Sequence, residues 1–545
     1  MLAASLRKAH LVSIALICVI IMCVVYNRRF QETEKTIVVS KEYTHKESLK
    51  HGLKVRSLIR SVIVKSFQIQ QLLNHDMNKL AEKNKDLVQR LVNWDRLLVP
   101  LENSLINEMT LLNNEDEEGD RYKLRELNRR AQHLIQHTQN QKDCRRAKKL
   151  FCNVEAKCGF GCLVHHYGVC LFLAIGTNRV MQWDLKAITD YPGLDEVFMP
   201  LSETCNNITG GKEAPEWYSE KSSNPTPVDT EVVKVTLIGS RDRQTPFAPM
   251  TIPEEFYPLV EPIHGDPLVW WAGQVQSYLM RPKAWVTREV QIIKQDIGFK
   301  HPVVGVHIRR TDKSNEANFQ RMEAYMDPVA NWYDKYVINN DVTNITKLVY
   351  VATDDLEYMD MLRNLYPEFT FITNQQSTSH ADTSSRLSSD GLKGIVTDVH
   401  LLVECDHFVG TFSSNIGRLV YEMKQQYGSD PTFTTTNIDH AYRYWGQAIQ
   451  LHKAVMDHKP SLGFCKRAAP DMRQIDLSKM ELMCEIEIKV GDIIEVSPES
   501  YHGYRSAGKN VRTQMFGAYP LFKVKDIIKT APYPSFYRTK SFEVE

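Results

Sequence analysis

The segment VVGVHIRRTDK, Val303 to Lys313, joins an apolar run to residues that bind anions. The apolar run predicts a buried strand, and Arg309, Arg310 and Lys313 come at its carboxyl end. Guanidinium groups form bidentate bonds with phosphate oxygens and do not lose their charge in proteins. The ligand that this cluster suits best is therefore a diphosphate.

Two further strand-like runs also end in polar residues. KLVYVAT, Lys347 to Thr353, precedes Asp354-Asp355, and HFVGTF, His407 to Phe412, precedes Ser413-Ser414-Asn415. Helical or loop segments separate the runs, which predicts parallel strands with crossover helices. Ligands bind at the carboxyl ends of strands in such sheets. The three polar ends together favour a ligand site.

A structural role for the two arginines is the alternative, because both could pair with Asp312, Asp354 or Asp355 in an ion network. The aspartates Asp354 and Asp355 also raise the question of a metal. Adjacent side chains on an extended segment point to opposite faces, and the arginines already supply positive charge. We therefore expect no required metal and no cofactor.

Length and charge limit the classes of protein. The chain has 545 residues, enough for two or three domains. Lysine and arginine number 67 and aspartate and glutamate 66, a formal net charge of +1. This balance gives no indication of nucleic-acid binding. Any anion site must be local.

The amino-terminal segment predicts a membrane anchor. Residues 1–8 form a short tail, and residues 9–26 contain the uncharged run LVSIALICVIIMCVVY between basic pairs. A cleaved signal peptide is the alternative, but no small-x-small cleavage pattern follows the run. Sequons at Asn207 and Asn344 are candidates for N-glycosylation. We expect a single-pass type II protein with a lumenal body.

Six of the eleven cysteines lie between residues 144 and 205: Cys144, Cys152, Cys158, Cys162, Cys170 and Cys205. A zinc site could use four of them. Behind a membrane anchor, however, six clustered cysteines are more typical of three disulfides, for which fifteen pairings exist. Among the others, Cys405 is predicted to be a buried free thiol. Cys465 and Cys484 form a candidate pair.

Residues 27–142 are predicted to form a helical stem. Apolar residues recur at heptad spacing, at Leu73, Leu80, Leu87, Trp94 and Leu101 and at Met77, Leu91, Leu98, Leu105 and Leu112. Pro100 should kink this helix, and a charged turn precedes a second helical run with Leu124, Leu127, Ala131, Leu134 and Ile135. The alternatives are a helical hairpin packed on the body and a stem that dimerises. The length of the seam favours a homodimer.

The carboxyl-terminal segment, residues 475–540, is predicted to be a separate small β-barrel. MCEIEIKVGDIIEV, GYRSAGKN and GAYPLFKVK resemble the strands of an SH3 domain. A barrel that merely packs on the body is the alternative. The usual ligand of an SH3 domain is a polyproline peptide, which binds in a groove with aromatic pairs, and a lumenal protein would meet few such partners.

Beyond these patterns, the chain resembles a known family, the α1,6-fucosyltransferases that add core fucose to N-glycans. The motifs that carry the resemblance are HGDPLVWW, RPKAW, FKHPVVGVHIRRTDK, VYVATDD, GIVTDVHLL and FVGTFSSN. It implies an α/β catalytic domain of the GT-B type over residues 143–470, with a Rossmann-type donor-binding part at about 300–430. It also implies a Golgi location.

The resemblance further implies roles for individual residues. GDP-fucose would be the donor, with Arg309 on its β-phosphate, Asp398 on the guanine edge, and a set of further residues around it: His307, Arg310, Asp312, Tyr325, Arg386, Ser414 and Asn415. Glu316 would be the general base on the acceptor hydroxyl, oriented by Lys313. Tyr501 and His502 of the barrel would lie near an N-glycan with a terminal GlcNAc. One residue is missing between Lys313 and Glu316 relative to the family pattern.

The reaction implied is an inverting transfer of fucose to O6 of the innermost GlcNAc, without a metal. The alternative is a non-catalytic lumenal protein that binds glycans or acts as a scaffold through its SH3 module. Intact Arg309, Arg310, Asp398 and Ser414 disfavour that alternative.

Overall fold

The computed structural model divides the chain into two compact units, residues 1–119 and 120–545. It describes residues 117–534 except 156–157, 184–190, 207–210, 220–221, 224–228, 238–246, 248–250, 311–318, 341, 343, 381–384, 440–441, 445–450, 461–483 and 503–504. The predicted anchor, the heptad seam, Asn207 and Cys465 lie outside the described residues. Within the described part, no helix is long and apolar enough to cross a membrane.

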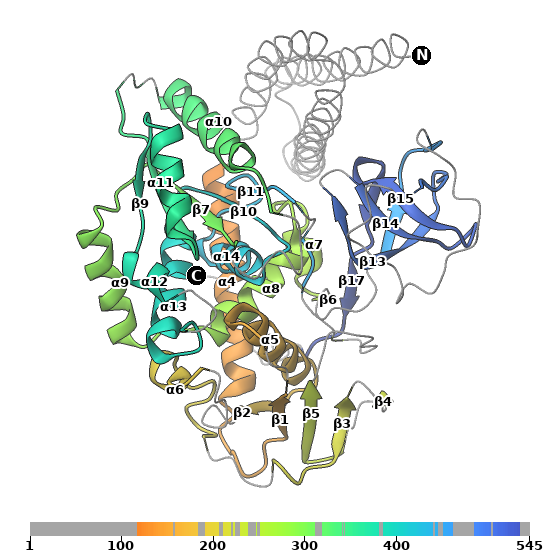
Figure 1. Ribbon diagram of the computed structural model, residues 1–545. Helices are drawn as coiled ribbons and strands as arrows, with labels where there is room; N and C mark the ends of the chain where they lie inside the picture. Colours follow the sequence, from red (N-terminus) through yellow and green to blue (C-terminus); the bar gives the residue numbers. More distant parts are fainter. Residues whose placement is uncertain are drawn as a thin grey trace, which may run out of the picture. The chain divides into compact units, whose positions relative to one another are not determined.

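A five-stranded parallel sheet contains the three strand-like runs (Figure 1). Its spatial order is β11-β10-β7-β8-β9, with β7 Val303–Ile308, β8 Leu348–Thr353, β9 Thr370–Ile372, β10 His407–Gly410 and β11 Thr435–Asn437. All residues of β7, β8 and β10 are buried, as expected for a parallel sheet covered on both faces. Ile308 pairs with Thr353, so β7 and β8 end level.

Crossover helices connect these strands. They are α10 Met322–Asn340, α11 Leu356–Leu365, α12 Gln375–Ser379, α13 Ser389–Glu404 and α14 Asn415–Lys424, with α9 Ala284–Asp296 before β7 and the 3-10 turn η4 Gln425–Tyr427 after α14. Helices α11 and α13 begin at side-chain caps, where Asp355 accepts from the Tyr358 N–H and Ser388 from that of Gly391. Val304, Val306, Val351 and Val409 pack with the inner face of α10 in one core.

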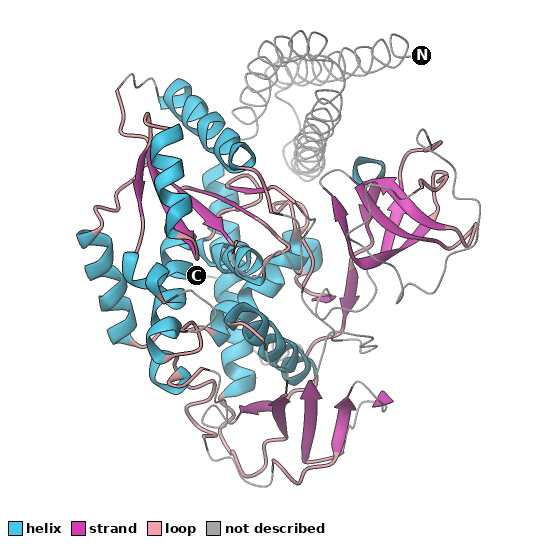
Figure 2. Ribbon diagram, in the orientation of Figure 1, coloured by secondary structure: helices cyan, strands magenta, loops and turns pink. Residues whose placement is uncertain are grey.

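A second sheet precedes the first in the chain, in the cysteine-rich region. Its order is β2-β1-β5-β3-β4, with β1 Lys149–Val154, β2 Val180–Trp183, β3 Glu216–Ser219, β4 Ser222–Ser223 and β5 Val232–Leu237. Strands β1, β2, β3 and β5 are parallel, and only β4 is antiparallel to its neighbour. Helix α5, Phe160–Gly176, follows β1 and is buried at every residue. The two parallel sheets confirm the predicted α/β class, as Figure 2 shows.

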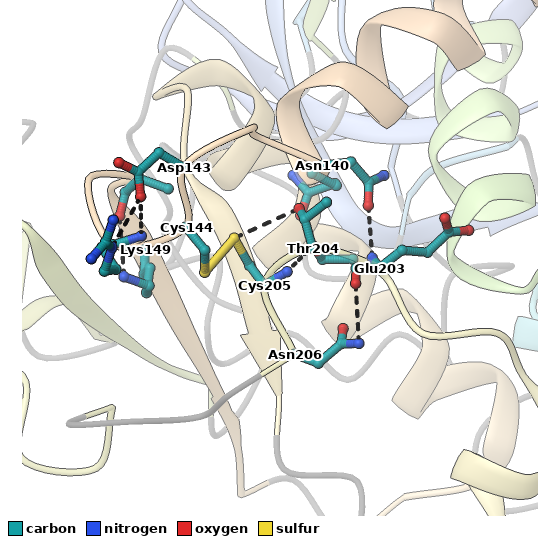
Figure 3. The surroundings of a disulfide bond; sticks show 12 residues. Asn140, Asp143, Cys144, Lys149, Glu203, Thr204, Cys205 and Asn206 are labelled. Atoms are coloured by element: carbon teal, nitrogen blue, oxygen red, sulfur yellow. Dashed lines mark hydrogen bonds and ion pairs between the residues drawn. A yellow bond between two sulfur atoms is a disulfide. The ribbon is translucent and has the colours of Figure 1, made fainter.

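All six clustered cysteines are paired. The disulfides are Cys144–Cys205, Cys152–Cys170 and Cys158–Cys162. The second joins β1 to α5, and the third encloses the start of α5. Figure 3 shows the first, beside which the Asn140 side chain accepts a 2.7 Å hydrogen bond from the Glu203 N–H. Cys405 is a buried free thiol, as predicted, and Cys484 is disulfide-bonded.

The second predicted helical run is α4, Glu117–Gln139. Its predicted apolar residues are all buried: Leu124, Leu127, Ala131, Leu134 and Ile135. Asn128 accepts from the Trp270 indole at 2.7 Å and donates to the Gln425 carbonyl at 2.9 Å. Trp270 belongs to α8, Pro267–Leu279, which is also fully buried. Helix α4 therefore packs on the body. This is the arrangement that the alternative of a helical hairpin predicts for a helix of the stem.

Three short elements complete this part of the chain: α6 Leu194–Val197, β6 Thr251–Pro253 and α7 Tyr257–Val260. Strand β6 pairs in parallel with β17, Lys529–Ala531, close to the carboxyl end. Tyr533 follows β17 and is buried, with ring centroids 5.1 Å from Phe247 and 5.4 Å from Trp271. Residues 529–533 are thereby attached to the part of the chain that contains β6 and α8.

The carboxyl-terminal sheet is antiparallel, in the order β15-β14-β13-β12-β16. Its elements are β12 Leu451–Ala454, β13 Ile493–His502, β14 Arg505–Asn510, β15 Phe516–Pro520, the turn η7 Leu521–Lys523 and β16 Val524–Asp526. A separate core fills it, with Ile486, Ile488, Ile494, Val496 and Tyr519 among its members. The sheet begins at Leu451, before the predicted boundary at residue 475. The prediction missed the first strand, β12, because it is short and carries little alternation of apolar and polar residues.

Candidate functional site

The two arginines after β7 are held by the two aspartates after β8. The Arg309 guanidinium lies 2.9 Å from the Asp354 carboxylate, whose other oxygen accepts from the Arg310 N–H at 2.8 Å. Arg310 approaches Asp355 at 3.5 Å. The ion network considered as the alternative is therefore present with Asp354 and Asp355. Asp354 is 2% exposed and Arg309 22%, so the guanidinium stays accessible to a ligand while its partner is buried.

Two aromatic rings enclose the Arg310 guanidinium. Its central carbon lies 4.7 Å from the ring centroid of Phe319 and 4.4 Å from that of Tyr358. Cation–π contacts of this kind restrict a guanidinium without neutralising it. Burial raises the pKa of Tyr358, although the positive charge of Arg310 opposes this shift. Arg310 is thus fixed by a carboxylate, a backbone bond and two rings.

Asp398 lies on α13 and is almost completely buried. One carboxylate oxygen accepts from the Tyr350 hydroxyl at 2.7 Å, and the other from the Ser377 hydroxyl at 2.5 Å. Burial raises the pKa of Asp398 to about 7, although both hydroxyl donors oppose the shift. Each oxygen retains a second lone pair, so the group can still accept from a ligand.

The turn after β10 brings two helix amino termini together. Ser414 is the cap residue of α14 and Asn415 its first residue. A Cβ on Gly161, at the start of α5, would lie 2.9 Å from the Asn415 Cβ and 3.0 Å from its carbonyl carbon. Glycine is therefore required for this close approach. Two positive helix ends meet here, an arrangement that favours an anion.

A fourth strand end adds a carboxylate that the sequence analysis missed. Asp439 follows β11 and accepts from the N–H groups of Phe412 at 2.8 Å and Ser413 at 3.2 Å, which orders the turn before α14. Tyr325, on α10, is buried. Its pKa is raised mainly by burial and, to a smaller extent, by the negative charge of Asp439. Asp439 gave no signal because the hydroxyl-rich run before it, TFTTTN, does not identify a strand end.

The remaining predicted donor residues are more scattered. His307 is buried at the penultimate position of β7, beside Ala352 of β8. Arg386 lies in the turn before α13, where its backbone contacts Gly391. Asp312, Lys313 and Glu316 lie outside the described residues.

The candidate acceptor residues lie on the carboxyl-terminal sheet. Tyr501 pairs with Ser506 and His502 with Arg505 at the end of β13. Their backbone positions are described, but their side chains are not. Asn344 is exposed in the loop before β8, a position accessible for a glycan.

A cavity of about 570 Å³ lies beside the five-stranded parallel sheet β11-β10-β7-β8-β9. Its lining comes from α11, α12 and the end of β9: Leu356, Met359, Asp360, Arg363, Thr373, Gln375, Gln376 and Ser379. None of the predicted site residues is among them. We therefore do not assign the cavity to the site.

Within the described residues, two groups of side chains that could bind a metal have other partners. Asp354 bonds to Arg309 and to the Arg310 N–H, and Asp355 caps α11, so both carboxylates have structural partners. Cys158, Cys162 and His166 bring possible ligand atoms within 4.8 Å of one another. The two sulfurs form a disulfide, however, and a disulfide does not supply thiolate ligands.

Comparison with known proteins gives the family. Residues 23–443 match the family described as "Alpha-(1,6)-fucosyltransferase N- and catalytic domains". The chain belongs to this family. This confirms the family resemblance of the motifs around Arg309 and Arg310.

Curated relatives agree. The Alpha-(1,6)-fucosyltransferase of Drosophila melanogaster is 32% identical over 437 residues, which are 79% of this chain and 66% of the relative. That of Caenorhabditis elegans is 29% identical over 422 residues, 75% of this chain and 69% of the relative. This chain thus spans slightly less than two thirds of the Drosophila relative. A solved structure of NodZ alpha-1,6-fucosyltransferase soaked with GDP-fucose matches with a TM-score of 0.31 and 10% identity, covering 51% of this chain and 92% of that chain.

Proposed function

We propose that this protein transfers L-fucose from GDP-β-L-fucose to O6 of the innermost GlcNAc of N-glycans. The observation that carries the proposal is that β7, which leads into Arg309 and Arg310, pairs in parallel with β10, which leads into α14, in a chain of the α-(1,6)-fucosyltransferase family. The arginines and the amino terminus of α14 therefore follow the same edge of the sheet, and the close approach of Gly161 to Asn415 adds the start of α5. Cations and helix ends together suit a diphosphate leaving group.

Donor binding is assigned to the residues at the strand ends. Arg309 binds the β-phosphate, and Arg310 stands beside it. Asp398 accepts hydrogen bonds from the guanine edge through its remaining lone pairs. Ser414 and Asn415 line the phosphate and sugar region, and His307, Asp312, Tyr325 and Arg386 complete the donor site.

The reaction is a single displacement with inversion at the fucosyl C1. The acceptor O6 forms a bond to C1 while the bond from C1 to the phosphate oxygen breaks, and GDP leaves with the electron pair. Glu316 takes the proton from O6 as general base, and Lys313 orients it. The cations stabilise the charge that develops on GDP, which gives the reaction a route without a metal.

The setting of the enzyme is also part of the proposal. A type II anchor at residues 9–26 would place the body in the Golgi lumen, where the three disulfides can form. The heptad seam would make a homodimer. The carboxyl-terminal sheet would act as an SH3-like module that holds the N-glycan near Tyr501 and His502.

The test is fucose transfer to a biantennary N-glycan with terminal GlcNAc, in the presence of EDTA. We expect fucose on O6 of the reducing-end GlcNAc, identified by mass spectrometry and linkage analysis, and its loss with Arg309→Ala. Folded protein that binds GDP but transfers nothing would contradict core fucosylation. Failure to bind GDP would favour the non-catalytic alternative.

A further inference from the structure

A buried contact between a histidine and a glutamate joins helices α5 and α14. His165 of α5 lies with its Nε2 3.0 Å from Oε1 of Glu422 of α14, and both side chains are 0% exposed. The same Glu422 oxygen accepts from the Tyr442 hydroxyl at 2.7 Å. Charged groups are placed fully inside a protein only where specific partners hold them. The pair therefore fixes the two helices to each other at a defined spacing.

The partners of the imidazole define where its protons lie. Nδ1 of His165 faces the carbonyl oxygen of Gly161, which can only accept, so Nδ1 carries a proton. Nε2 faces Oε1 of Glu422 at 3.0 Å, so each ring nitrogen has a polar partner. The imidazole thus links Gly161 directly to Glu422.

This link ends at the donor site. Gly161 is the residue whose close packing against Asn415 brings the two helix ends together. Asn415 in turn accepts a 2.6 Å bond from Arg418, another buried residue of α14. A shift of α14 along α5 would break the pair and move the amino terminus of α14 away from that of α5. The chain from Gly161 through His165 to Glu422 therefore sets the spacing of the two helix ends.

We propose that His165 and Glu422 are positioning residues that hold the two helix amino termini at the spacing a nucleoside diphosphate requires. Neither side chain touches the ligand. The identity of the ligand in this inference rests on the proposed function. The role of the pair in holding the two helix ends rests on the geometry alone. Its consequence is that the pair controls donor affinity more than the rate of the chemical step.

Two substitutions in the full chain separate this role from a general loss of stability. Glu422→Leu keeps a similar volume but removes the link, and Glu422→Gln keeps a polar partner for His165. We expect Glu422→Leu to weaken GDP binding, measured by calorimetry, by roughly 10- to 100-fold. Glu422→Gln should recover most of that affinity. For GDP-fucose, KM should rise and kcat should change by less than about two-fold.

The carboxyl-terminal sheet offers a matched control. His458 and Glu485 form a second buried pair, 3.2 Å apart and 9% and 2% exposed. Glu485→Leu should lower the melting temperature as Glu422→Leu does, because each leaves a buried histidine without its carboxylate. Only Glu422→Leu should weaken GDP binding.

Hydrogen exchange gives a reading that needs no ligand. The amides of Leu163 and Arg418 close the first turns of α5 and α14 by bonding to the carbonyls of Gly159 and Ser414. Both should exchange faster in Glu422→Leu, or in His165→Leu if the Glu422 variant does not fold, and not in Glu422→Gln or Glu485→Leu. Unchanged exchange, or GDP affinity equal to that of Glu485→Leu, would overturn the proposal. If the wild type does not bind GDP, the proposed function fails, and exchange still decides whether the pair holds the helix ends.

Discussion

At the scale of single residues, the site combines partly exposed arginines with the carboxylates that hold them. Arg309 and Arg310 are held by Asp354 and Asp355 at the edge of the sheet. Such pairing does not exclude a ligand, because a guanidinium has five donors and these contacts use only some of them. The carboxylates fix the arginines in advance, which lowers the entropy that ligand binding would otherwise cost. The ion network is therefore compatible with the proposed binding of a phosphate by the arginines.

Asp398 leads to a prediction on pH. Its folded pKa of about 7 lies above the ordinary value of 3.8, so between these values the folded protein binds more protons than the unfolded one, and its stability falls as pH rises. Only the ionised group accepts through both oxygens. GDP affinity should therefore increase as pH rises through about 7, measured by calorimetry.

Asp398→Asn is the control for that titration. At pH 8 it should weaken GDP binding by at least about ten-fold, because an amide cannot accept through both ends of its side chain. The remaining affinity should not change across this pH range. A wild-type affinity that is flat with pH would contradict the role of Asp398.

The polar residues were predictable in part from the sequence. Arg309, Arg310 and Ser414 follow strands that their apolar runs identify. The partners Tyr358 and Asp439 were not predictable, because each comes from another segment and meets the site only after the chain has folded. Side-chain pairing between distant segments has no local sequence signal.

At the scale of elements, the sequence was most informative where strands are fully buried. The run Val303–Ile308 is β7 as predicted, and the other two predicted runs differ from β8 and β10 only at their ends. The sheet in the cysteine-rich region was not predicted. Helix α5 is buried on all sides and shows no amphipathic period, so it gave no helical signal.

The contact between α5 and α14 leads to a prediction on Gly161. Gly161→Ala places a Cβ 2.9 Å from the Asn415 Cβ and 3.0 Å from the Asn415 carbonyl carbon, so α14 must shift. We expect donor KM to rise by about ten-fold or more in a steady-state assay. Gly159→Ala should have a much smaller effect, because its Cβ would meet only the Tyr191 hydroxyl at 3.9 Å. Equal effects of the two substitutions would contradict the account.

At the scale of the whole molecule, the carboxyl end of the chain contributes to the stability of the catalytic part. Strand β17 pairs with β6, and the buried Tyr533 packs between Phe247 and Trp271. The sequence did not predict this attachment, because β6 and β17 have three residues each. Pairs of such short strands are determined by long-range contacts.

Tyr533→Ala should therefore destabilise the protein. Truncating a buried aromatic side chain costs about 3–5 kcal/mol of unfolding free energy, which urea denaturation would measure. Tyr122→Ala is the control, since that ring is 61% exposed and should change the unfolding free energy by less than about 0.5 kcal/mol. A loss at Tyr533 no larger than that at Tyr122 would show that the carboxyl end is not part of the core.

The central claim is that the paired arginines bind a diphosphate, and calorimetric titration with GDP and with GMP tests it most directly. The wild type should bind GDP roughly 10- to 100-fold more tightly than GMP, the contribution of one or two charged hydrogen bonds. Arg309→Met should remove this preference and leave GMP binding unchanged. Arg512→Met, which breaks the ion pair with Asp492 in the carboxyl-terminal sheet, should keep it. Equal affinity of the wild type for GDP and GMP, or an unaltered preference in Arg309→Met, would contradict the account.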